Sequence, residues 1–431
     1  MADTKPRLRL VDGRWQEIGS PASVSAPTAT SLPFKEQAAF WRRKVNVPTD
    51  TWRDVQREDH AQAFMVAGAA RVDLLDDLRK AVDKAVLGGG SIESFRKDFD
   101  AVVARTGWEY NGGRNWRTRI IYTTNVRSSY MAGRWQQIQA IKHRRPYMEY
   151  VHNDSVRHPR PQHLAWNGTI LLVDDPWWNT HYCPNGYGCQ CTTRTLAQRD
   201  MDALGKTGPD EAPTSVDDTT GIDPGFDYNV GQAAASMPAA DRMGQKIMTM
   251  PKPFRDAALS DAQRRQADMF ADWPAAVRRA QSADADMPSV QQPVGFVRPR
   301  VAQRLDQGTL PGRADKPLTS ALLTADDDAL ATALASTEGN ALSALQRLAQ
   351  DLPQVLADGT VPVLWDAHAQ QLLYAHAIAD GRFAVASFAL DATGPRGRGQ
   401  GGAVSGRLQT LALLDAAHLA TERYQLLDGA L

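Results

Sequence analysis

The stretch WRTRIIYTTNVRSSYMAGRWQQIQAI, residues 116–141, decides the fold of the first half of this 431-residue chain. Its apolar side chains recur every three, four or seven residues, which is the spacing of one face of an α-helix. We therefore predict one long helix over 116–141, the longest of the chain, with a single stripe facing the core. The residues expected in that stripe are Trp116, Ile120, Thr124, Met131, Trp135 and Ile138.

The same helix is strongly basic, although the whole chain balances 49 Lys and Arg against 49 Asp and Glu. Any affinity for a polyanion must therefore come from a local patch rather than from net charge. Two interpretations stay open for the arginines that we consider candidate contacts: internal pairing with carboxylates or carbonyls, and contact with a polyanion such as DNA. The basic residues from 114 to 145, a range without any acidic residue, are Arg114, Arg117, Arg119, Arg127, Arg134, Lys142, Arg144 and Arg145.

Among these, the candidate partner or nucleic-acid contacts are Arg127, Arg134, Arg144 and Arg145. Arg127 and Arg134 lie one heptad apart at the edge of the apolar stripe, where a guanidinium needs a partner. Arg144 and Arg145 follow the predicted helix, and we expect them to be exposed.

Three further helices precede the long one. Apolar residues at helical spacing predict them within 34–45, 72–86 and 91–103, and GGG at 88–90 ends the second. Ser91 is expected to cap the third, because a serine side chain accepts hydrogen bonds from the first turn of a helix. The chain is thus expected to be α+β and multidomain, with a helical N-terminal half.

A turn-rich segment follows, in which WWNTHYCPNGYGCQC (177–191) holds all three cysteines. This grouping of cysteines is compatible with a metal site, with a redox dithiol, or with a purely structural role in folding. A short apolar run, TILLV (169–173), predicts a buried strand just before it. We expect the tryptophans of this half to be core residues rather than platforms for stacking bases: Trp41, Trp52, Trp108, Trp116, Trp135, Trp166, Trp177 and Trp178.

Composition divides the chain into four regions. Residues 1–33 are expected to be a disordered tail, and 200–294 an acidic linker followed by a helical region, with little in 201–235 to fill a core. Residues 295–431 are expected to form a C-terminal α/β accessory domain. There, alternating apolar residues around Asp380-Gly381 predict a β-hairpin with a two-residue type I′ turn. The remaining region is 34–199.

Several classes of protein are disfavoured. No apolar run is long enough to span a bilayer, and the N-terminus lacks the apolar core of a secretory signal, so we expect no membrane association and a location in the cytosol of the cell that makes the chain. Three cysteines in one segment argue against a disulfide-stapled secreted fold. We find no P-loop, GxGxxG or nucleophile-elbow motif.

Long blocks of 34–199 carry a family resemblance. FKEQAAFWRRKVNVPTDTWRDV, HAQAFMVAG, WRTRIIYTTNVRSSYMAGRWQQ and CPNGYGCQC occur in an order that resembles the phage Mu F-like minor head proteins, the head-morphogenesis family of tailed phages and prophages. The resemblance implies a structural protein of the phage head, found in the virion and, during assembly, in the host cytoplasm. It implies no enzymatic reaction, and it implies contacts with the portal protein, a scaffold or the major capsid protein. Contact with phage DNA is a further hypothesis.

The resemblance also implies a ligand set for a structural Zn²⁺, since members carry a cysteine or histidine before an Asn-Gly or Asp-Gly turn, then a histidine, and then Cys-x-Cys. In this chain these are His163, His181, Cys189 and Cys191, and Cys183 could replace His181. The alternative is that both histidines form ordinary hydrogen bonds and the cysteines pack inside. The nearby tract HNDSVRHPRPQH, 152–163, is expected to be an extended surface loop because proline breaks ligand geometry.

The C-terminal region keeps a second function open. It faintly resembles the small barnase/EndoU-type nuclease-like modules fused to phage head proteins, which would make the chain a carrier of a nuclease effector. Lysine is absent after Lys316, so we favour a binding module and assign no catalytic residue. The residues that a nuclease could use are His368, His376, Arg382, Arg407 and Thr410.

Overall fold

A computed structural model describes residues 8–11, 14–17, 34–55, 57–156, 158–214, 219–282, 289–307, 310–313, 317–335, 339–379, 381–390 and 406–431. The chain divides into two units, Met1–Phe34 and Lys35–Leu431. In the first, β1 (Leu8–Val11) pairs with β2 (Arg14–Glu17) in antiparallel register. Most of the predicted disordered tail lies outside the described residues, so it stays a prediction.

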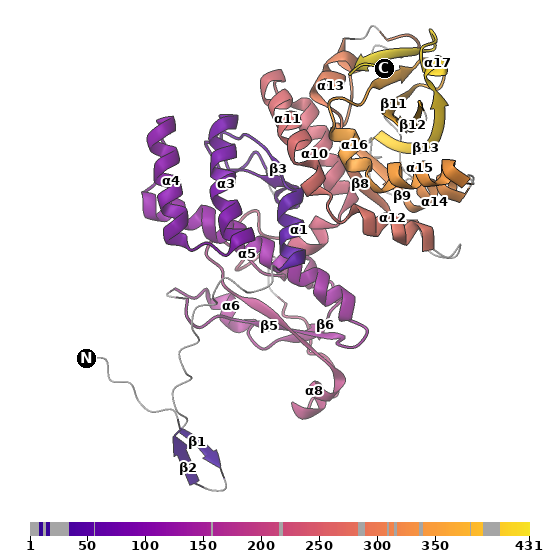
Figure 1. Cartoon of the computed structure of the whole chain (residues 1–431). Helices are drawn as coiled ribbons and strands as arrows, with labels where there is room; N and C mark the ends of the chain where they lie inside the picture. The colour runs from indigo at the N-terminus through magenta and orange to yellow at the C-terminus, as the bar shows by residue number, and fades with distance from the viewer. Residues whose placement is uncertain are drawn as a thin grey trace. The chain divides into compact units, whose positions relative to one another are not determined.

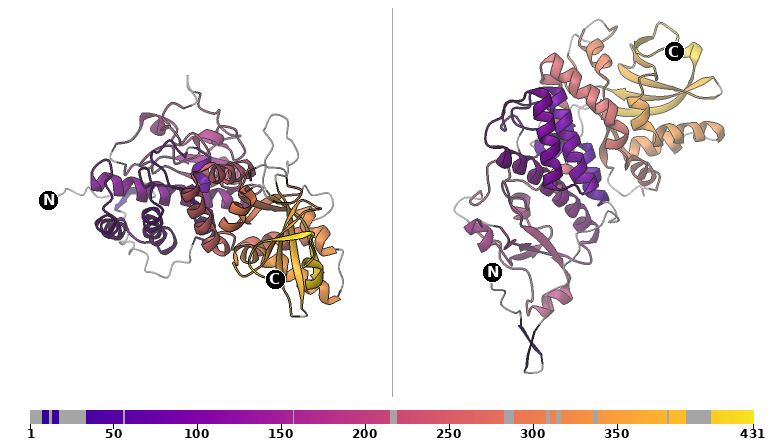
Figure 2. Two further views of the ribbon diagram at one scale, coloured as in Figure 1. Left: turned by 90° about the horizontal axis from the view of Figure 1, so that it is seen from above. Right: turned by 60° about the vertical axis from the view of Figure 1, so that its left-hand side comes forward.

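The second unit begins with the predicted helices, of which α3 and α4 lie side by side (Figures 1 and 2). Gly89, with a φ of 68°, ends α3, and the Ser91 side chain accepts a hydrogen bond of 3.2 Å from the Ser94 N–H, as expected of a cap. Trp41, Phe64, Leu75, Leu78, Phe95, Phe99 and Ile121 are among the residues of the N-terminal cluster that these helices bury. The elements are α1 (Lys35–Arg43), β3 (Val45–Asn46), α2 (Asp59–Gln62), β4 (Ala63–Phe64), α3 (Val72–Gly88), α4 (Ile92–Thr106) and α5 (Arg114–Ile141).

The long helix α5 agrees with its predicted bounds, but its apolar stripe agrees only in the second half. Met131, Trp135 and Ile138 are buried as expected. In the first half, Ile121 is buried and Trp116 is 48% exposed, so the predicted phase was wrong by one residue there. The reason is Arg117, which is itself buried because its guanidinium lies 5.7–6.0 Å from the ring centroids of Trp108, Tyr110 and Trp116.

The second half of α5 packs against a small sheet of order β6-β5-β7, in which both pairs are antiparallel. The predicted strand in TILLV is β6. Met131, Trp135, Ile138, Tyr150, Trp166, Trp177, Trp178, Tyr182 and the three cysteines belong to the central cluster of buried residues. The elements of this part are β5 (Tyr147–Val151), α6 (Pro161–Ala165), β6 (Ile170–Leu172), α7 (Trp178–His181), β7 (Thr192–Leu196) and α8 (Gln198–Ala203).

Residues 219–235 do not behave as a linker. Ile222, Phe226 and Val230 are buried in the central cluster, and α9 (Val230–Ala234) packs on α5. The expectation that 201–235 has little to fill a core was therefore wrong for this stretch. The acidic composition of this stretch suggested a linker, although its few apolar residues are spaced so that they can be buried together.

The C-terminal part contains a seven-stranded sheet of order β14-β10-β11-β12-β13-β9-β8, in which only the β13/β9 pair is parallel. Helices cover one of its faces, and α17 contributes Leu419 to a smaller cluster formed with the alternate residues of β11 and β12. The elements are α10 (Met237–Thr249), α11 (Lys252–Met269), α12 (Trp273–Ser282), β8 (Gln291–Phe296), α13 (Pro299–Asp306), β9 (Leu322–Asp326), α14 (Asp327–Ala335), α15 (Gly339–Gln350), α16 (Leu352–Ala357), β10 (Val363–Asp366), β11 (Gln371–Ala377), β12 (Arg382–Ala389), β13 (Gly406–Asp415), α17 (Ala416–Leu419) and β14 (Tyr424–Asp428).

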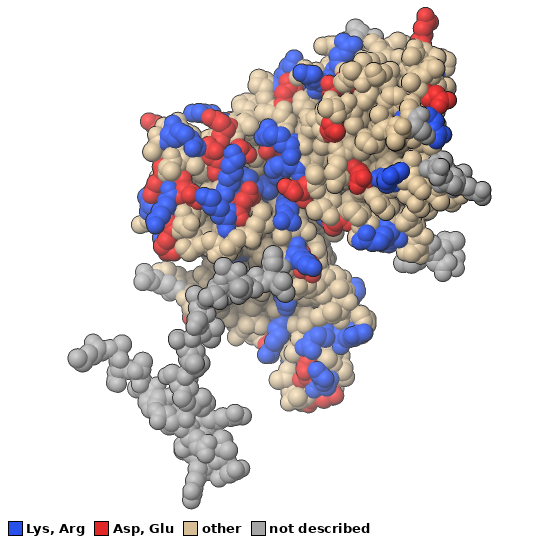
Figure 3. All heavy atoms as spheres, in the orientation of Figure 1, with Lys and Arg blue, Asp and Glu red and all other residues tan. Residues whose placement is uncertain are grey.

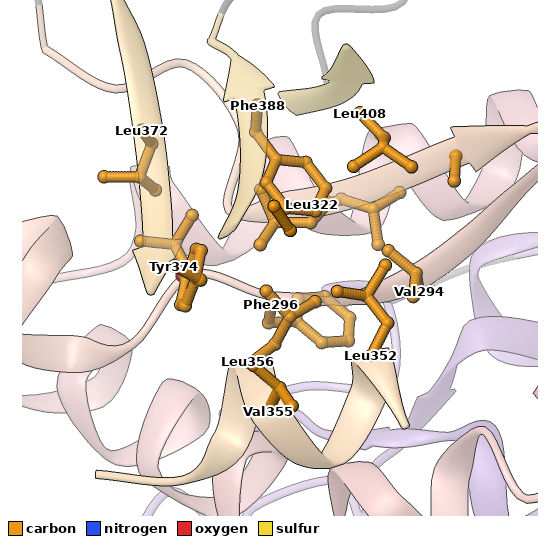
Figure 4. Packing of buried hydrophobic residues seen from close by; sticks show 14 of the residues in the cluster. Val294, Phe296, Leu322, Leu352, Val355, Leu356, Leu372, Tyr374, Phe388 and Leu408 are labelled. Atoms are coloured by element: carbon orange, nitrogen blue, oxygen red, sulfur yellow. The ribbon is translucent and has the colours of Figure 1, made fainter. Parts of the chain in front are cut away.

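The packed face of this sheet forms the C-terminal cluster. Figure 4 shows Phe296 of the sheet next to Leu352 and Leu356 of α16, with Leu322 and Phe388 farther from that helix. The same cluster includes side chains of α10–α12 and of Val45, Val47, Val55 and Ala63. The domain boundaries at 199/200 and 294/295 stay predictions. At each boundary, buried side chains from the two sides pack in the same cluster.

The predicted hairpin is present as β11 and β12, and its turn is one residue longer than expected. The Gly381 N–H donates to the Ile378 carbonyl, and the Ile378 N–H donates to the Arg382 carbonyl. Gly381 has a φ of 80°, which completes a three-residue loop of the bulge type. Asp380 lies outside the described residues.

Helices and one large mainly antiparallel sheet make the chain an α+β protein, as predicted. Among the described helices, none is both long enough and apolar enough to cross a membrane.

The packing of α9 on α5 can be tested at Gly231. A Cβ at this position would lie 2.1 Å from Trp135 Cβ, so Gly231→Ala should lower the free energy of unfolding by about 1–3 kcal/mol. Gly88→Ala is the matched control, since a Cβ there meets no atom within 4 Å and alanine favours a helix by up to about 1 kcal/mol. Urea denaturation of both variants gives the comparison. Equal stability of the Gly231 variant and the parent would mean that 219–235 does not pack as described.

Candidate metal centre and the adjoining cleft

Buried cysteine and histidine side chains meet beside the small sheet. His163 from α6 and Cys189 and Cys191, which precede β7, place their ligand atoms within 4.8 Å of one another. The Nδ1 atom of His163 lies 3.8 Å from Cys189 Sγ and 3.5 Å from Cys191 Sγ. Three of the four residues in the predicted ligand set are therefore together.

The ring of His163 is held in one orientation. Its Nε2 atom lies 2.9 Å from the Gly221 carbonyl oxygen, and the ring stacks on Trp166 with centroids 5.1 Å apart. A carbonyl accepts only from an N–H, so Nε2 carries the proton and Nδ1 keeps a lone pair directed at the two sulfur atoms. This is the arrangement that fixes a histidine as a metal ligand.

His181 does not belong to this group, which corrects the prediction. Its ring stacks on Trp177 with centroids 4.3 Å apart, and its Nδ1 atom lies 2.8 Å from Thr180 Oγ1. His152 lies at the site instead, with Nδ1 3.5 Å from Cys191 Sγ. The expectation that 152–163 is a surface loop was wrong at both ends, because His152 directly follows β5 and is buried.

The cysteines are all free and buried. A hydrogen bond from Cys189 lowers the pKa of Cys191 to about 6, and the same bond together with burial raises the pKa of Cys189 to about 12. Burial raises the pKa of Cys183 well above its usual value. The Cys189/Cys191 pair therefore offers one thiolate near neutral pH, and sulfur is a donor that soft metal ions prefer.

The arginines of α5 are mostly committed to internal contacts. Arg127 donates to the Cys191 carbonyl at 2.5 Å, and Arg134 donates to Gln137 Oε1 at 3.1 Å. Arg145, expected to be exposed, donates to Thr195 and pairs with Asp200. Of the four candidate contacts, Arg144 alone is exposed with no side-chain hydrogen bond or ion pair to the described part of the chain, and Arg119 on α5 is exposed in the same way. The DNA hypothesis thus depends on these two side chains.

A cleft of about 710 Å³ opens next to the Cys/His segment, and three exposed aromatic rings line it. Trp52 is 39% exposed, Trp116 is 48% exposed and Tyr187, from the loop between Cys183 and Cys189, is 40% exposed. The expectation that Trp52 and Trp116 are core residues was wrong. A narrower cavity that shares Trp52, Thr124 and Tyr187 continues the cleft.

Two fixed contacts hold Tyr187 at this cleft. Its backbone N–H donates to Asp223 Oδ2 at 2.7 Å, and its ring meets Phe226 edge to face at 4.9 Å. Arg160 donates to both the Tyr187 carbonyl and the Asp223 carboxylate. The sequence analysis did not single out Tyr187. The one signal in the sequence was its position between Cys183 and Cys189.

The residues considered for a nuclease do not all converge. Arg407 of β13 pairs with Ala389 of β12, and Ala389 pairs with Gln371 at the start of β11. His376 lies about 17 Å from Gln371 along β11, so it is far from Arg407. Arg407 is also paired with the carboxylate of the buried residue Asp326. Arg382, by contrast, lies two residues from Ala384, the partner of His376 on β12, so these two candidates are diagonal neighbours on one face of the sheet.

Comparison with known proteins identifies the family. The family profile described as "Phage Mu protein F like protein" matches residues 76–194. The chain is 30% identical over 409 residues to the "Putative capsid assembly protein F" of Escherichia phage Mu, covering 83% of this chain and 87% of that protein. This chain belongs to the family of phage Mu F-like proteins. It is also 28% identical over 304 residues to the "Mu-like prophage FluMu F protein" of Haemophilus influenzae, covering 62% of this chain and 72% of the relative. No solved structure matches it significantly.

The Mu F-like profile coincides with the region described above. Its matched range starts in α3 and ends in β7, so it contains α5, the Cys/His group and Tyr187. The match to the phage Mu protein covers 83% of this chain of 431 residues, and a span of that share must include β8 and β9 of the C-terminal sheet wherever it begins.

The role of Arg127 in this Mu F-like chain is testable against Arg144 on the same basic segment. Arg127→Met removes a charged hydrogen bond to Cys191 and should lower the free energy of unfolding by about 1.5–3 kcal/mol. Arg144→Met should change it by less than about 0.5 kcal/mol, since the side chain is exposed. Thermal or urea denaturation measures both. Similar stability of the two variants would contradict a structural role for Arg127.

Proposed function

We propose that the chain acts in head assembly by binding another head protein through the cleft lined by Trp52, Trp116 and Tyr187. The observation that carries this proposal is the exposure of three aromatic rings around one cavity. Exposed rings that gather in one concavity are unusual on a surface that faces only water. The family membership, and the name of the phage Mu relative as a putative capsid assembly protein, supply the setting.

The composition of the cleft favours a protein partner. Trp, Tyr and Arg are the residues most enriched where binding energy concentrates in protein interfaces. Arg53 lies over the Trp52 ring at 5.4 Å, and Arg117 lies over the Trp116 ring at 5.7 Å. Each ring is thus held by a cation before any partner arrives, which lowers the entropic cost of ordering it.

A nucleic-acid ligand fits the cleft less well, because single-strand binding needs a continuous basic groove beside the rings. Asp50 lines the cleft together with the two arginines. Burial lowers the pKa of His60 to about 3, so this residue of the lining is neutral, and burial beside Arg79 lowers the pKa of Lys44 to about 7. Figure 3 shows Lys and Arg side chains interspersed with Asp and Glu over α3 and α4 rather than gathered into a basic surface on this face.

The occupant that we propose is an extended polypeptide segment with apolar side chains, contributed by the portal protein, a scaffold or the major capsid protein. Aromatic rings take up its side chains, and the amides of Asn111 and Asn125, which line the cleft, are suited to its backbone. The chain would then act in the host cytoplasm during assembly and remain in the virion. This function is one of binding and needs no catalytic residue.

Incorporation into heads tests the proposal. Trp52→Ala combined with Trp116→Ala should leave the chain folded, with a modest fall in melting temperature because Trp116 is one of the rings beside the buried Arg117, and should reduce the copies per head at least about tenfold. Tyr130→Ala is the control, because Tyr130 is an exposed aromatic residue of α5 that is not among the residues lining the cleft. Quantitative mass spectrometry of purified proheads gives the copy number.

Three results would oppose the proposal. Full incorporation of the double variant into heads would mean that assembly does not require the cleft. Loss of incorporation with Tyr130→Ala as well would indicate a non-specific defect. Binding of single-stranded DNA by the parent chain, abolished in the double variant, would assign the cleft to nucleic acid instead.

A further inference from the structure

The Cys/His group beside the cleft has no role in the proposed binding function, and its geometry points to a ligand of its own. The distances between sulfur and nitrogen are 3.5, 3.8 and 3.5 Å. In a tetrahedral zinc site, with bonds of about 2.3 Å to sulfur and about 2.0–2.1 Å to nitrogen, neighbouring sulfur and nitrogen ligands lie about 3.5 Å apart. The observed separations are those of the edges of such a tetrahedron.

We propose that His152, His163, Cys189 and Cys191 bind a structural Zn²⁺ ion. Two thiolates, two neutral imidazoles and a divalent cation sum to zero charge, which suits a site where all four side chains are buried. The thiols release their protons to solvent as the metal bonds form.

His152 supplies the fourth ligand in place of His181. Its Nδ1 atom is in contact with Cys191 Sγ, but the set of ligand atoms within 4.8 Å of one another contains His163, Cys189 and Cys191 without it. The imidazole of His152 therefore turns toward the ion when the fourth bond forms. His181 is directed elsewhere by its stacking on Trp177 and cannot replace it.

Surrounding contacts hold the ligands ready. The Gly221 carbonyl fixes His163, and Arg127 holds the Cys191 carbonyl. The backbone N–H of His152 donates to Asn167 Oδ1 at 2.8 Å. These partners come from α5, from the turn before β6 and from residues 219–235, so an ion at this point would tie together segments that lack a large core of their own.

The metal content of the full-length chain is the direct test. Protein purified, incubated with Zn²⁺ and dialysed should retain one equivalent per chain by elemental analysis, and chelation should lower its melting temperature. Substitution by Co²⁺ should give the intense visible bands and the thiolate charge-transfer band of a tetrahedral site with two sulfur ligands.

Two matched histidine variants then assign the fourth ligand. His152→Asn should weaken metal affinity, measured by competition with a chromogenic chelator, by more than the roughly 10–100-fold that loss of an outer partner costs. His181→Asn should leave affinity within about twofold of the parent, even if it lowers stability through its lost stacking.

The outcomes separate cleanly. Parent protein without retained zinc, and with a melting temperature indifferent to chelation, overturns the metal site. Zinc retained equally by His152→Asn and lost by His181→Asn overturns the ligand assignment. Should a variant fail to fold, the cobalt spectrum of the parent still decides the site, because bands typical of six-coordinate cobalt without thiolate contradict it. None of these results depends on whether the aromatic cleft binds a head protein.

Discussion

The shared burial of α5 in two separate cores is the constraint on which the first half of the structure depends. Its 28 residues span about 42 Å, and Ile121 lies in the N-terminal cluster while Met131, Trp135 and Ile138 lie in the central cluster. The Cys/His segment is attached to the same helix. Tyr182 donates to the Met131 carbonyl at 2.9 Å, and Arg127 donates to the Cys191 carbonyl. A change in the rotation of α5 would move both cores and the segment between them.

The cleft follows from that arrangement. Trp52 comes from the loop after β3, Trp116 from the first turn of α5 and Tyr187 from the loop between two cysteines, so three segments distant in sequence must be positioned together. Trp116 faces the cleft because Arg117 takes the buried position beside it. The Cys/His group flanks the loop that carries Tyr187, and this is why a structural ion there and a binding surface beside it are compatible uses of one region.

Much of the helical part could be predicted from the sequence, because apolar spacing, the Ser91 cap and the glycines at 88–90 act locally. The failures have physical reasons. Arg117 is buried by stacking on aromatic rings, which a scale that treats arginine as polar cannot foresee. Ile222, Phe226 and Val230 were too sparse among acidic residues to indicate a core. The grouping of His163, Cys189 and Cys191 was expected from the family pattern, whereas the contact of His152 with Cys191 depends on where β5 ends in space, which the sequence does not give.

Site-specific crosslinking tests the central claim most directly, which is that the cleft beside the Cys/His segment receives another head protein. A photoreactive phenylalanine analogue in place of Tyr187 keeps an aromatic ring at the cleft, and the same analogue in place of Tyr130 is the control on an exposed part of α5. Irradiation during head assembly should join the chain at position 187, and not at position 130, to one defined head protein that mass spectrometry identifies. Crosslinks to DNA, equal crosslinks from both positions, or none from position 187 in heads that contain the chain would contradict the account.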